Sequence, residues 1–502
     1  MVTSSAEQPG AGAVDVAVVG AGPAGVAAAV VAAESGARVV LIDAGSGPGG
    51  QYYRQPAPEL PARPGDPPPH PWRAFDELHR RLRRQVTAGR AMLSPDTTVW
   101  AAAGRGPFLL RTRPGDREPR APLGAVTARA VVVATGAFDR HLPFPGWELP
   151  GVISGGAAQA LVKGSRVLPG RATVVAGTGP FLLAVAATLL EAGGRVVAVV
   201  EANAPGSLAT RLPHLLPAAS KGRELARFVA LLARYRVPYL RRHRVVRATG
   251  ADGVESVVVA RVDNRWRVKP RSVRTLSCDA LAVGYGFTAQ TDLLLQLGCP
   301  VVAGPDGGLA VDVDTMQRTG VAGVVSAGET TGIGGADLAL LEGLVAGAAA
   351  ARHCGAVPAL AAAELARLRR RIARLRRFAD ALHRAFPVVE GWQAELDDDT
   401  VVCRCEEVTA GEIRQVMHGL GAGDARTVKL LSRAGMGWCQ GRICGFPIDR
   451  MCASLPDAVG DDATGADRLT RASVRPLAAP VPLASIAALS PDAVDREDPV
   501  CQ

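Results

Sequence analysis

A glycine-rich turn close to the start of the chain limits the possible folds more than any other segment. Gly20, Gly22 and Gly25 follow the spacing G-x-G-x-x-G between an apolar run at 15–20 and a predicted helix at 24–35. In this setting the first glycine allows a tight turn, the second lets a pyrophosphate approach the backbone, and the third lets the helix pack on the strand. The turn predicts a parallel α/β sheet with a dinucleotide at the helix start; a tight turn without a ligand is the alternative.

An acidic residue supports the dinucleotide interpretation. Asp43 ends the next apolar strand, RVVLIDA, 18 residues after Gly25, where its carboxylate can accept hydrogen bonds from ribose hydroxyls. Two further segments favour FAD over NAD. GPGGQYYRQ places Gly50 and Gln51 where a flavin can lie on the backbone, and VVSAGETTGIGG at 324–335 resembles the second FAD motif, in which an acid bonds the ribityl chain.

This second motif carries Glu329 where aspartate is usual, so we expect its contact with the ribityl chain to be shifted by one methylene. Another segment, VVVATGAFDR at 131–140, resembles the strand that links the FAD and NAD domains of two-dinucleotide flavoproteins. The predicted FAD contacts are Gly20, Gly22, Pro23, Ala24, Gly25, Asp43, Gly50, Gln51, Thr135, Gly136, Gly328 and Glu329.

A second strand–turn–helix begins at Ala172 and repeats the first less completely. Gly177 and Gly179 supply G-x-G, but the third position is Leu182, which loosens helix–strand packing or moves the phosphate. Glu201 ends the following strand and predicts a ribose contact that disfavours the extra phosphate of NADP. NAD or another adenine nucleotide is one interpretation of this site, and a fold relic without a ligand is the other. The unit has no C-x-x-C, which excludes a disulfide mechanism of the thioredoxin-reductase type.

Four of the nine cysteines gather near the C-terminus. Cys403 and Cys405 form C-x-C in CRCEEVT. After a spacer of 33 residues, Cys439 and Cys444 form C-x-x-x-x-C in WCQGRIC. Four thiolates from one short domain suit either a 2Fe–2S cluster or a tetrahedral zinc ion, and the spacing alone leaves both open. The other five cysteines are scattered, which predicts small buried or incidental thiols.

Composition excludes several other classes of protein. The 502-residue chain is 48% hydrophobic and 21% charged, as is usual for globular proteins. Its net charge of +10 comes with 57 basic residues, only four of them Lys, and no aromatic-interleaved basic patch indicates nucleic-acid binding. The N-terminus predicts no signal peptide, and the two long uncharged runs each contain a glycine-rich turn, so no transmembrane segment is predicted. A cytoplasmic location is expected.

The segments also predict an order of domains. Residues 56–71 are rich in proline and predict a surface loop, and the Arg-rich stretch 364–386 predicts one long helix. The expected divisions are an N-terminal tail at 1–13, an FAD-binding domain in two parts at 14–150 and 276–355, an NAD-like second nucleotide domain at 151–275, a helical linker at 356–397, a cysteine domain at 398–455 and a C-terminal tail at 456–502.

Several segments together resemble a known family: GAGPAG, GGQYYR, ATGAFDRHLPFPGWELPGV, GTGPFLLAVA, GYGFTAQ, AGETTGIGGADLALLEG, CRCEEVT and SRAGMGWCQGRIC. Over nearly all of 14–485 the chain resembles the FAD-dependent alpha-type subunits of multimeric amine and amino-acid dehydrogenases, a family with hydrogen cyanide synthase, opine oxidase and proline dehydrogenase subunits. The resemblance implies an α/β, two-dinucleotide-binding, thioredoxin-reductase-like flavoprotein fold with a small C-terminal domain like bacterioferritin-associated ferredoxin. It also implies a 2Fe–2S cluster, rather than zinc, on Cys403, Cys405, Cys439 and Cys444.

In this family an amine or amino acid is oxidised on the flavin of a separate beta-type subunit, and the alpha-type subunit carries electrons onward. The resemblance therefore implies a subunit that relays electrons in the dehydrogenation of an amine, amino acid, imino acid or opine. Its implied partners are a beta-type FAD-dependent subunit, which oxidises the substrate, and, as an option, a small ferredoxin-like subunit. A self-sufficient NADH-dependent reductase feeding a ferredoxin-like acceptor and a non-enzymatic interaction module stay open as alternatives. The sequence identifies no catalytic acid, base or nucleophile.

Overall fold

The structure is a computed structural model that describes residues 13–56, 60, 73–115, 123–204, 219–454, 465–473 and 475–487. The expected N-terminal tail and the proline-rich loop at 56–71 lie almost entirely outside these residues, whereas the expected C-terminal tail is described at 465–473 and 475–487. Within them, no helix combines the length and the apolar character that crossing a membrane requires.

The first α/β unit is built on a seven-stranded sheet in the order β3-β2-β1-β6-β5-β4, with β19 also paired to β6. Its strands are β1 Val14–Val19, β2 Val39–Ile42, β3 Ala91–Ser94, β4 Thr97–Ala103, β5 Phe108–Pro114, β6 Gly124–Val133 and β19 Val324–Ser326, and its helices are α1 Pro23–Glu34, α2 Arg73–Thr87 and α9 Ala336–His353. Strands β1, β2, β3, β6 and β19 are parallel, so their carboxyl ends share one edge, whereas β5 pairs antiparallel with both β6 and β4.

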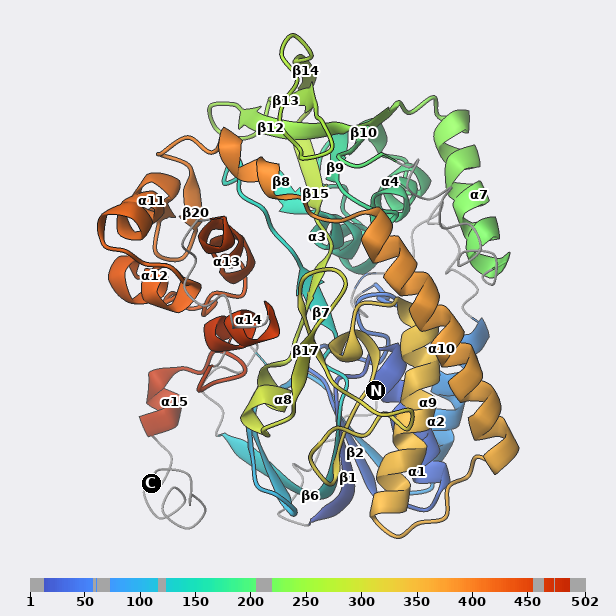
Figure 1. Cartoon of the computed structure of the whole chain (residues 1–502). Coiled ribbons are helices and arrows are strands. Elements are labelled where there is room, and N and C mark those ends of the chain that lie inside the picture. The colour runs from blue at the N-terminus through green and yellow to red at the C-terminus, as the bar shows by residue number, and fades with distance from the viewer. Residues whose placement is uncertain are drawn as a thin grey trace.

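The second α/β unit has a parallel five-stranded sheet in the order β11-β10-β9-β15-β8. Its strands are β8 Val152–Ser154, β9 Ala172–Gly177, β10 Arg195–Glu201, β11 Tyr239–Arg241 and β15 Ala280–Gly284, and its helices are α3 Gly155–Ala160, α4 Phe181–Glu191 and α7 Ala219–Arg234. An antiparallel sheet of β12 His243–Thr249, β13 Ser256–Arg261 and β14 Arg274–Ser277 projects at the top of Figure 1. Both units are what the two glycine-rich turns predicted.

Short strands join the two units. Strand β7 (Ala137–Asp139) leaves the first unit and pairs antiparallel with β16 (Phe287–Ala289), which returns to it. The returning chain forms α8 (Asp292–Gln296) and the hairpin β17 (Val301–Ala303) to β18 (Leu309–Val311) before entering β19. The antiparallel crossing fixes the two sheets relative to each other.

The C-terminal part begins with the long Arg-rich helix, α10, which runs along α9 at the right of Figure 1. The cysteine domain at the left of that view then follows. Its elements are β20 Val401–Cys403, β21 Val408–Thr409, α11 Ala410–Gly419, α12 Ala425–Ser432 and α13 Gly445–Ala453, followed by α14 Gly465–Ser473 and α15 Leu483–Ala487. Helix α10 spans Ala362–Ala385, close to the predicted 364–386; sequence patterns rarely fix helix ends more closely.

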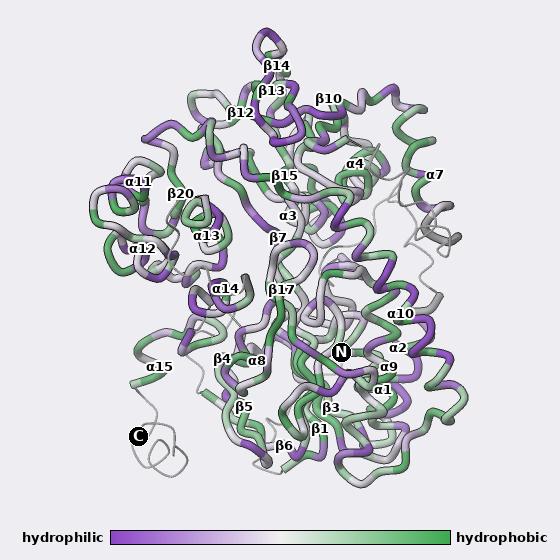
Figure 2. Tube along the Cα trace, viewed as in Figure 1, coloured by the Kyte–Doolittle hydropathy of each residue, from purple (hydrophilic) through white to green (hydrophobic). Residues whose placement is uncertain are grey.

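Helices α1 and α9 pack backbone against backbone beneath the first sheet. A Cβ on Gly343 would lie 2.1 Å from the carbonyl oxygen of Ala24, and one on Gly347 would lie 2.3 Å from that of Ala28. Neither distance is compatible with a side chain, so glycine lets the helices approach closely. Figure 2 shows both helices mostly in the hydrophobic colour, whereas α10 alternates between the two colours along its length.

The cysteine domain shares one hydrophobic core with the second α/β unit. Buried side chains from the second sheet, such as Val174 and Val200, belong to the same cluster as Trp392, Val402 and Ile413 of the C-terminal part. Burial of apolar surface at about 25 cal/mol per Å² is the main force that holds such a junction. The domain is therefore packed onto the α/β units.

Candidate functional site

The first glycine turn has the geometry that a diphosphate requires. Gly20 has a φ of +101°, and a Cβ there would lie 2.3 Å from the carbonyl oxygen of Ala134. A Cβ on Gly25 would lie 1.7 Å from the Gly20 carbonyl oxygen, whereas one on Gly22 would meet nothing within 4 Å. The turn is therefore closed on the protein side and open at Gly22. Pro23 begins α1, and no side chain caps that end, which leaves the first N–H groups for an anion.

The predicted acid and the second glycine segment hold this turn in place. Asp43 accepts hydrogen bonds from the backbone N–H of Ala21 (2.5 Å) and of Gly45 (2.7 Å). Burial raises the pKa of Asp43, and these two hydrogen bonds oppose the rise. A Cβ on Gly50 would lie 2.8 Å from the Gly22 Cα, so this glycine packs directly on the turn.

Residues 51, 135 and 136 lie in different settings. Gln51 is exposed, and its side-chain oxygen accepts a hydrogen bond from Arg54. The Thr135 hydroxyl donates to the carbonyl oxygen of Gln290 at 2.7 Å. The backbone N–H of Gln290 in turn donates to the carbonyl oxygen of Gly136 at 2.9 Å. The segment after β6 is thereby tied to the returning strand, next to the crossing of the two units.

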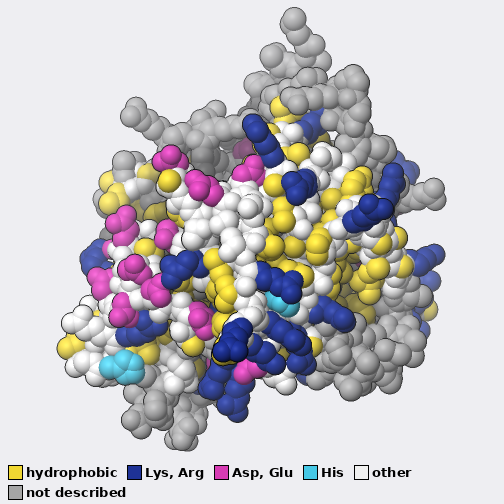
Figure 3. Space-filling view, turned by 90° about the horizontal axis from the view of Figure 1, so that it is seen from above, with side chains coloured by type: hydrophobic (Ala, Val, Ile, Leu, Met, Phe, Trp, Pro, Cys, Tyr) yellow, Lys and Arg dark blue, Asp and Glu magenta, His cyan; other side chains and the backbone are white. Residues whose placement is uncertain are grey.

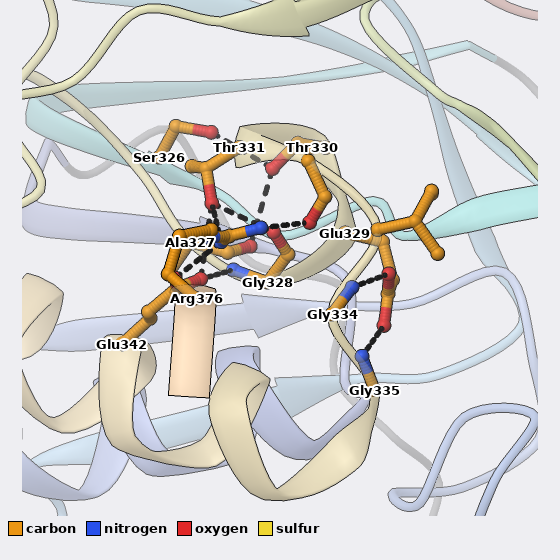
Figure 4. A network of polar contacts seen from close by, with 12 residues as sticks. Ser326, Ala327, Gly328, Glu329, Thr330, Thr331, Gly334, Gly335, Glu342 and Arg376 are labelled. Atoms are coloured by element: carbon orange, nitrogen blue, oxygen red, sulfur yellow. Dashed lines mark hydrogen bonds and ion pairs between the residues drawn. The ribbon is translucent and has the colours of Figure 1, made fainter. Parts of the chain in front are cut away.

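The second predicted FAD motif forms a compact loop between β19 and α9 (Figure 4). Its acid, Glu329, accepts hydrogen bonds from the backbone N–H groups of Gly334 (2.8 Å) and Gly335 (2.9 Å). Burial raises the pKa of Glu329, and the same two hydrogen bonds counter it. The extra methylene relative to aspartate thus lets the carboxylate reach the loop that starts α9. Gly328 has a φ of +83°, which explains glycine at this position.

Two residues that the sequence analysis missed hold this loop from the other side. Glu342 of α9 is 1% exposed and accepts from the N–H of Gly328 at 2.9 Å. Arg376 of α10 pairs with Glu342 at 2.5 Å and donates to the carbonyl oxygen of Gly332 at 2.6 Å. Thr331 donates its hydroxyl proton to the Glu342 carboxylate (3.0 Å). The pattern gave no signal, because Glu342 lies in an apolar run and Arg376 is one of many arginines on its helix.

The second glycine turn is closed by the protein itself. Glu201 is 0% exposed and accepts hydrogen bonds from the Thr178 hydroxyl and from the N–H groups of Gly179 and Asn203. Burial raises its pKa to about 7, against the effect of these bonds.

The linker after α10 covers this second turn. A Cβ on Gly179 would lie 3.8 Å from the Phe386 Cβ, and the amide of Asn203 donates to the Pro387 carbonyl oxygen at 2.8 Å. On the protein side a Cβ on Gly177 would lie 1.9 Å from the Gly284 carbonyl oxygen. The turn keeps its fold, but its acid and its outer face contact the protein.

The four predicted metal ligands gather in the cysteine domain as two pairs. A hydrogen bond from the Cys444 thiol lowers the pKa of Cys403 to about 6, and backbone donors such as the Gly435 N–H act in the same direction. Cys405 and Cys439 form the other pair. Among the described residues no group of three His, Cys, Asp or Glu side chains is already arranged around a metal position.

The surroundings of these thiols still suit a thiolate-held cluster. Cys403, Cys439 and Cys444 are buried and Cys405 is partly so, as a centre shielded from water requires. A Cβ on Gly437 would lie 2.1 Å from the Cys405 Cβ, so the loop can approach this thiol only with glycine there. Four soft thiolate donors fit 2Fe–2S chemistry.

Polar contacts fix the cysteine loop against the first unit. Arg442, between the last two cysteines, pairs with Asp292 of α8 at 3.3 Å, and Arg475 pairs with the same carboxylate at 2.8 Å. The Arg442 guanidinium also donates to the Cys439 carbonyl oxygen at 3.2 Å. Because Asp292 lies two residues after Gln290, the contacts run from a cluster ligand to the segment bonded to Thr135.

An aromatic contact fixes the other side of the domain. The indole N–H of Trp147 donates to the Val401 carbonyl oxygen at 2.6 Å, and the Arg404 guanidinium lies 4.0 Å from the centre of the Trp147 ring. Trp147 is 2% exposed. The C-x-C segment is therefore anchored to the chain that leads from the first unit to the second.

Comparison with known proteins agrees with this architecture. The family model for pyridine nucleotide-disulphide oxidoreductases matches residues 14–352, and that for the BFD-like [2Fe-2S] binding domain matches residues 401–453. An opine oxidase subunit from Rhizobium meliloti is 35% identical over 95% of this chain and 98% of its own. Hydrogen cyanide synthase subunit HcnB of Pseudomonas aeruginosa is 34% identical over 86% of this chain and 92% of its own.

A solved structure supports the fold. L-proline dehydrogenase from P. horikoshii superimposes with a TM-score of 0.62 at 19% identity, covering 92% of this chain and 77% of that one. The chain belongs to the pyridine nucleotide-disulphide oxidoreductase family. Within it, the chain is an FAD-dependent, 2Fe–2S oxidoreductase subunit related to HcnB and to the opine oxidase protein, which confirms the resemblance, the fold class and both cofactors expected from the sequence.

Replacing Arg376 with Met tests the ion pair that holds the second FAD motif. Because Glu342 would stay buried without its partner, we expect the free energy of unfolding to fall by about 3 kcal/mol. This value is the lower end of the range for breaking a buried ion pair, because Arg376 is partly exposed. FAD should also dissociate more readily. Urea unfolding and flavin fluorescence measure both effects. Arg377→Met, on the exposed side of α10, is the control, and equal stability of the two variants would refute the assigned role.

Replacing Cys439 with Ser tests the ligand set. We expect the iron–sulfur absorbance and bound iron to be lost while the flavin bands stay, because the two cofactors lie in different domains. Cys452→Ala, a buried cysteine of the same domain, should keep its iron. Iron content equal to that of the parent in the Cys439 variant would show that the ligand assignment is wrong.

Proposed function

We propose that this chain is the electron-relaying subunit of a hetero-oligomeric dehydrogenase that acts on an amine, amino acid, imino acid or opine. When bound, FAD exchanges two electrons as a hydride or singly, and a 2Fe–2S cluster exchanges one. The observation that carries the proposal is the fixed attachment of the cysteine loop to the FAD unit through Arg442, Asp292 and the segment at Gln290. This attachment keeps the cysteine loop beside the FAD unit, an arrangement that suits electron transfer between the two centres.

The chain's own residues contribute binding, orientation and shielding. The turn at Gly22 presents backbone N–H groups to the diphosphate, and the Glu342–Arg376 pair orients the loop proposed to hold the ribityl chain. Burial of three of the four cysteines excludes water from the cluster. We assign no catalytic acid or base to this chain and place substrate oxidation on a partner flavoprotein. The relatives named above are themselves subunits, which supports this division.

An exposed apolar surface beside the cluster is the proposed docking face for that partner. Leu430 and Leu431 of α12, with Met436 and Trp438 of the following loop, are exposed, and Trp438 is 75% exposed directly before Cys439. Trp and Met are enriched at protein interfaces, and a tryptophan in water is unusual without a partner. Electron exchange needs close approach to the cluster, which this face offers.

The NADH-dependent reductase is less well supported. A nicotinamide dinucleotide on the second turn needs its phosphates at Gly179 and its ribose at Glu201. A Cβ on Gly179 would already lie 3.8 Å from the Phe386 Cβ, and the Glu201 carboxylate already has three donors. A non-enzymatic interaction module is also less well supported, because such a protein would not need the open, uncapped turn at Gly22 that suits a diphosphate. A cytoplasmic location stays a prediction.

An anaerobic titration separates the two redox proposals. We expect NADH to leave the visible spectrum of the purified chain unchanged, because the second turn is covered, while dithionite bleaches both the flavin and the iron–sulfur bands. Rapid bleaching of the flavin by stoichiometric NADH would overturn the relay proposal in favour of the reductase.

Co-expression with a candidate beta-type FAD-dependent flavoprotein tests the partnership. The expected product is a stable complex by size-exclusion chromatography that reduces a dye with an amino acid, imino acid or opine, which neither protein does alone. Trp438→Ala should weaken the complex at least tenfold, as removal of a central interface Trp does. Leu483→Ala, an 82% exposed apolar residue on α15, is the control. Dehydrogenase activity in this chain alone would contradict the proposal.

A further inference from the structure

A short segment after α14, residues 475–478 (the clasp), bonds to the loop between the last two cysteines. The Arg475 guanidinium donates to the carbonyl oxygen of Gln440 at 2.6 Å. In the other direction, the Arg442 guanidinium donates to the carbonyl oxygen of Ala478 at 2.6 Å. Each segment thus bonds through an arginine to the backbone of the other. The clasp lies in the part of the chain expected as a C-terminal tail, and it is nevertheless bonded to the cysteine loop.

The clasp is also bonded to the first α/β unit. The backbone N–H of Ala478 donates to the carbonyl oxygen of Trp100 on β4 at 2.7 Å. The side-chain amide of Gln296 on α8 donates to the carbonyl oxygen of Pro476 at 3.1 Å, and its oxygen accepts from the backbone N–H of Ala102 at 3.0 Å. The clasp therefore connects the loop of two predicted cluster ligands with the unit that carries the predicted FAD contacts.

A buried group of three charged side chains lies where these segments meet. The carboxylate of Asp292 is 3.3 Å from the Arg442 guanidinium and 2.8 Å from that of Arg475. The three side chains are 8%, 13% and 11% exposed. Two guanidinium groups and one carboxylate carry one positive charge in excess. Arg442 also donates to the Cys439 carbonyl oxygen at 3.2 Å, so this excess charge lies beside a predicted cluster ligand.

Exposed charges have a weaker effect on this loop than the buried group has. Seen from above in Figure 3, Asp and Glu side chains gather at the left, the side on which Figure 1 shows the cysteine domain, and Lys and Arg side chains gather in the middle. Asp399, Glu407 and Glu412 are exposed acids of this domain. Water and salt screen such charges, whereas they screen buried charges much less. The electrostatic potential at the loop therefore depends mainly on the buried group.

We propose that Arg475 is a positioning residue for the cluster, and that the buried group of Arg442, Asp292 and Arg475 raises the reduction potential of the cluster. Reduction adds one electron to a centre that four thiolates already make negative, so a buried positive charge beside it stabilises the reduced form. In the step concerned, one electron leaves the reduced flavin and enters the oxidised cluster. The buried group favours this direction of flow, an inference that rests on the relay function proposed above.

Spectroelectrochemical titration of the full FAD- and iron-loaded chain tests the proposal with two variants that change the buried charge in opposite directions. Arg475→Met removes a positive charge and should lower the cluster midpoint potential. The expected shift is at least tenfold in the equilibrium between reduced and oxidised cluster, which corresponds to 59 mV. Asp292→Asn removes the negative charge but keeps a hydrogen-bond acceptor, and it should raise the potential. Potentials that move in the same direction in both variants, or in neither, overturn the proposal.

Two further variants separate the charge from the contacts. Arg475→Lys keeps the charge but loses the planar fork, so we expect a potential close to that of the parent and faster release of iron to a chelator. Equally slow release from this variant and the parent would contradict the positioning role. Arg471→Met removes an exposed arginine of α14 and should change neither the potential nor the release of iron.

The iron content of the variants decides the remaining cases. If Arg475→Met loses its iron, Asp292→Asn decides alone: a higher potential supports the proposal, and an equal or lower one overturns it. Loss of iron from both variants would show a structural role only and overturns it as well. All potentials are measured on this chain without a partner, so the inference can fail while the relay function stands, and the relay function can fail while the shifts are observed.

Discussion

The ion pair between Arg376 and Glu342 connects the parts of this molecule. Glu342 lies on a helix that touches the first glycine turn, while Arg376 lies on the helix that leads to the cysteine domain. A buried carboxylate without a partner is costly, so this pair holds α10 to α9 at that point. Leu365 and Leu368 of α10 hold it further along, in a buried apolar cluster with residues of α9. The direction of α10 then places Phe386 and Pro387 over the second glycine turn and delivers the chain to the cysteine domain.

The second α/β unit supports another domain of the chain. Its sheet is intact, and Gly177 still permits the tight turn against Gly284. Its acid, however, faces inward, and its outer surface carries the linker and shares a core with the cysteine domain. The unit therefore serves as the support on which the cysteine domain is packed.

Sequence patterns predicted those features that depend on local backbone chemistry. Gly20 and Gly25 are needed wherever a strand, a tight turn and a helix meet a diphosphate, and the cysteine spacing is read within one short domain. The covering of the turn near Glu201 was beyond reach, because the Pro387 carbonyl oxygen meets the Asn203 amide only in the folded chain. The partnership of Glu342 and Arg376 was equally hidden, since each residue looks ordinary in its own helix. The roles of individual cofactor residues stay predictions.

The glycines at 343 and 347 have a mechanical consequence. Because α1 and α9 touch backbone to backbone at Ala24 and Ala28, the two helices have no compressible side-chain layer between them. Helix α1 begins at the turn proposed for the diphosphate, and α9 begins at the loop proposed for the ribityl chain. Any thermal displacement of one helix must therefore carry the other with it, so that the two ends of a bound flavin nucleotide would rest on a single rigid body.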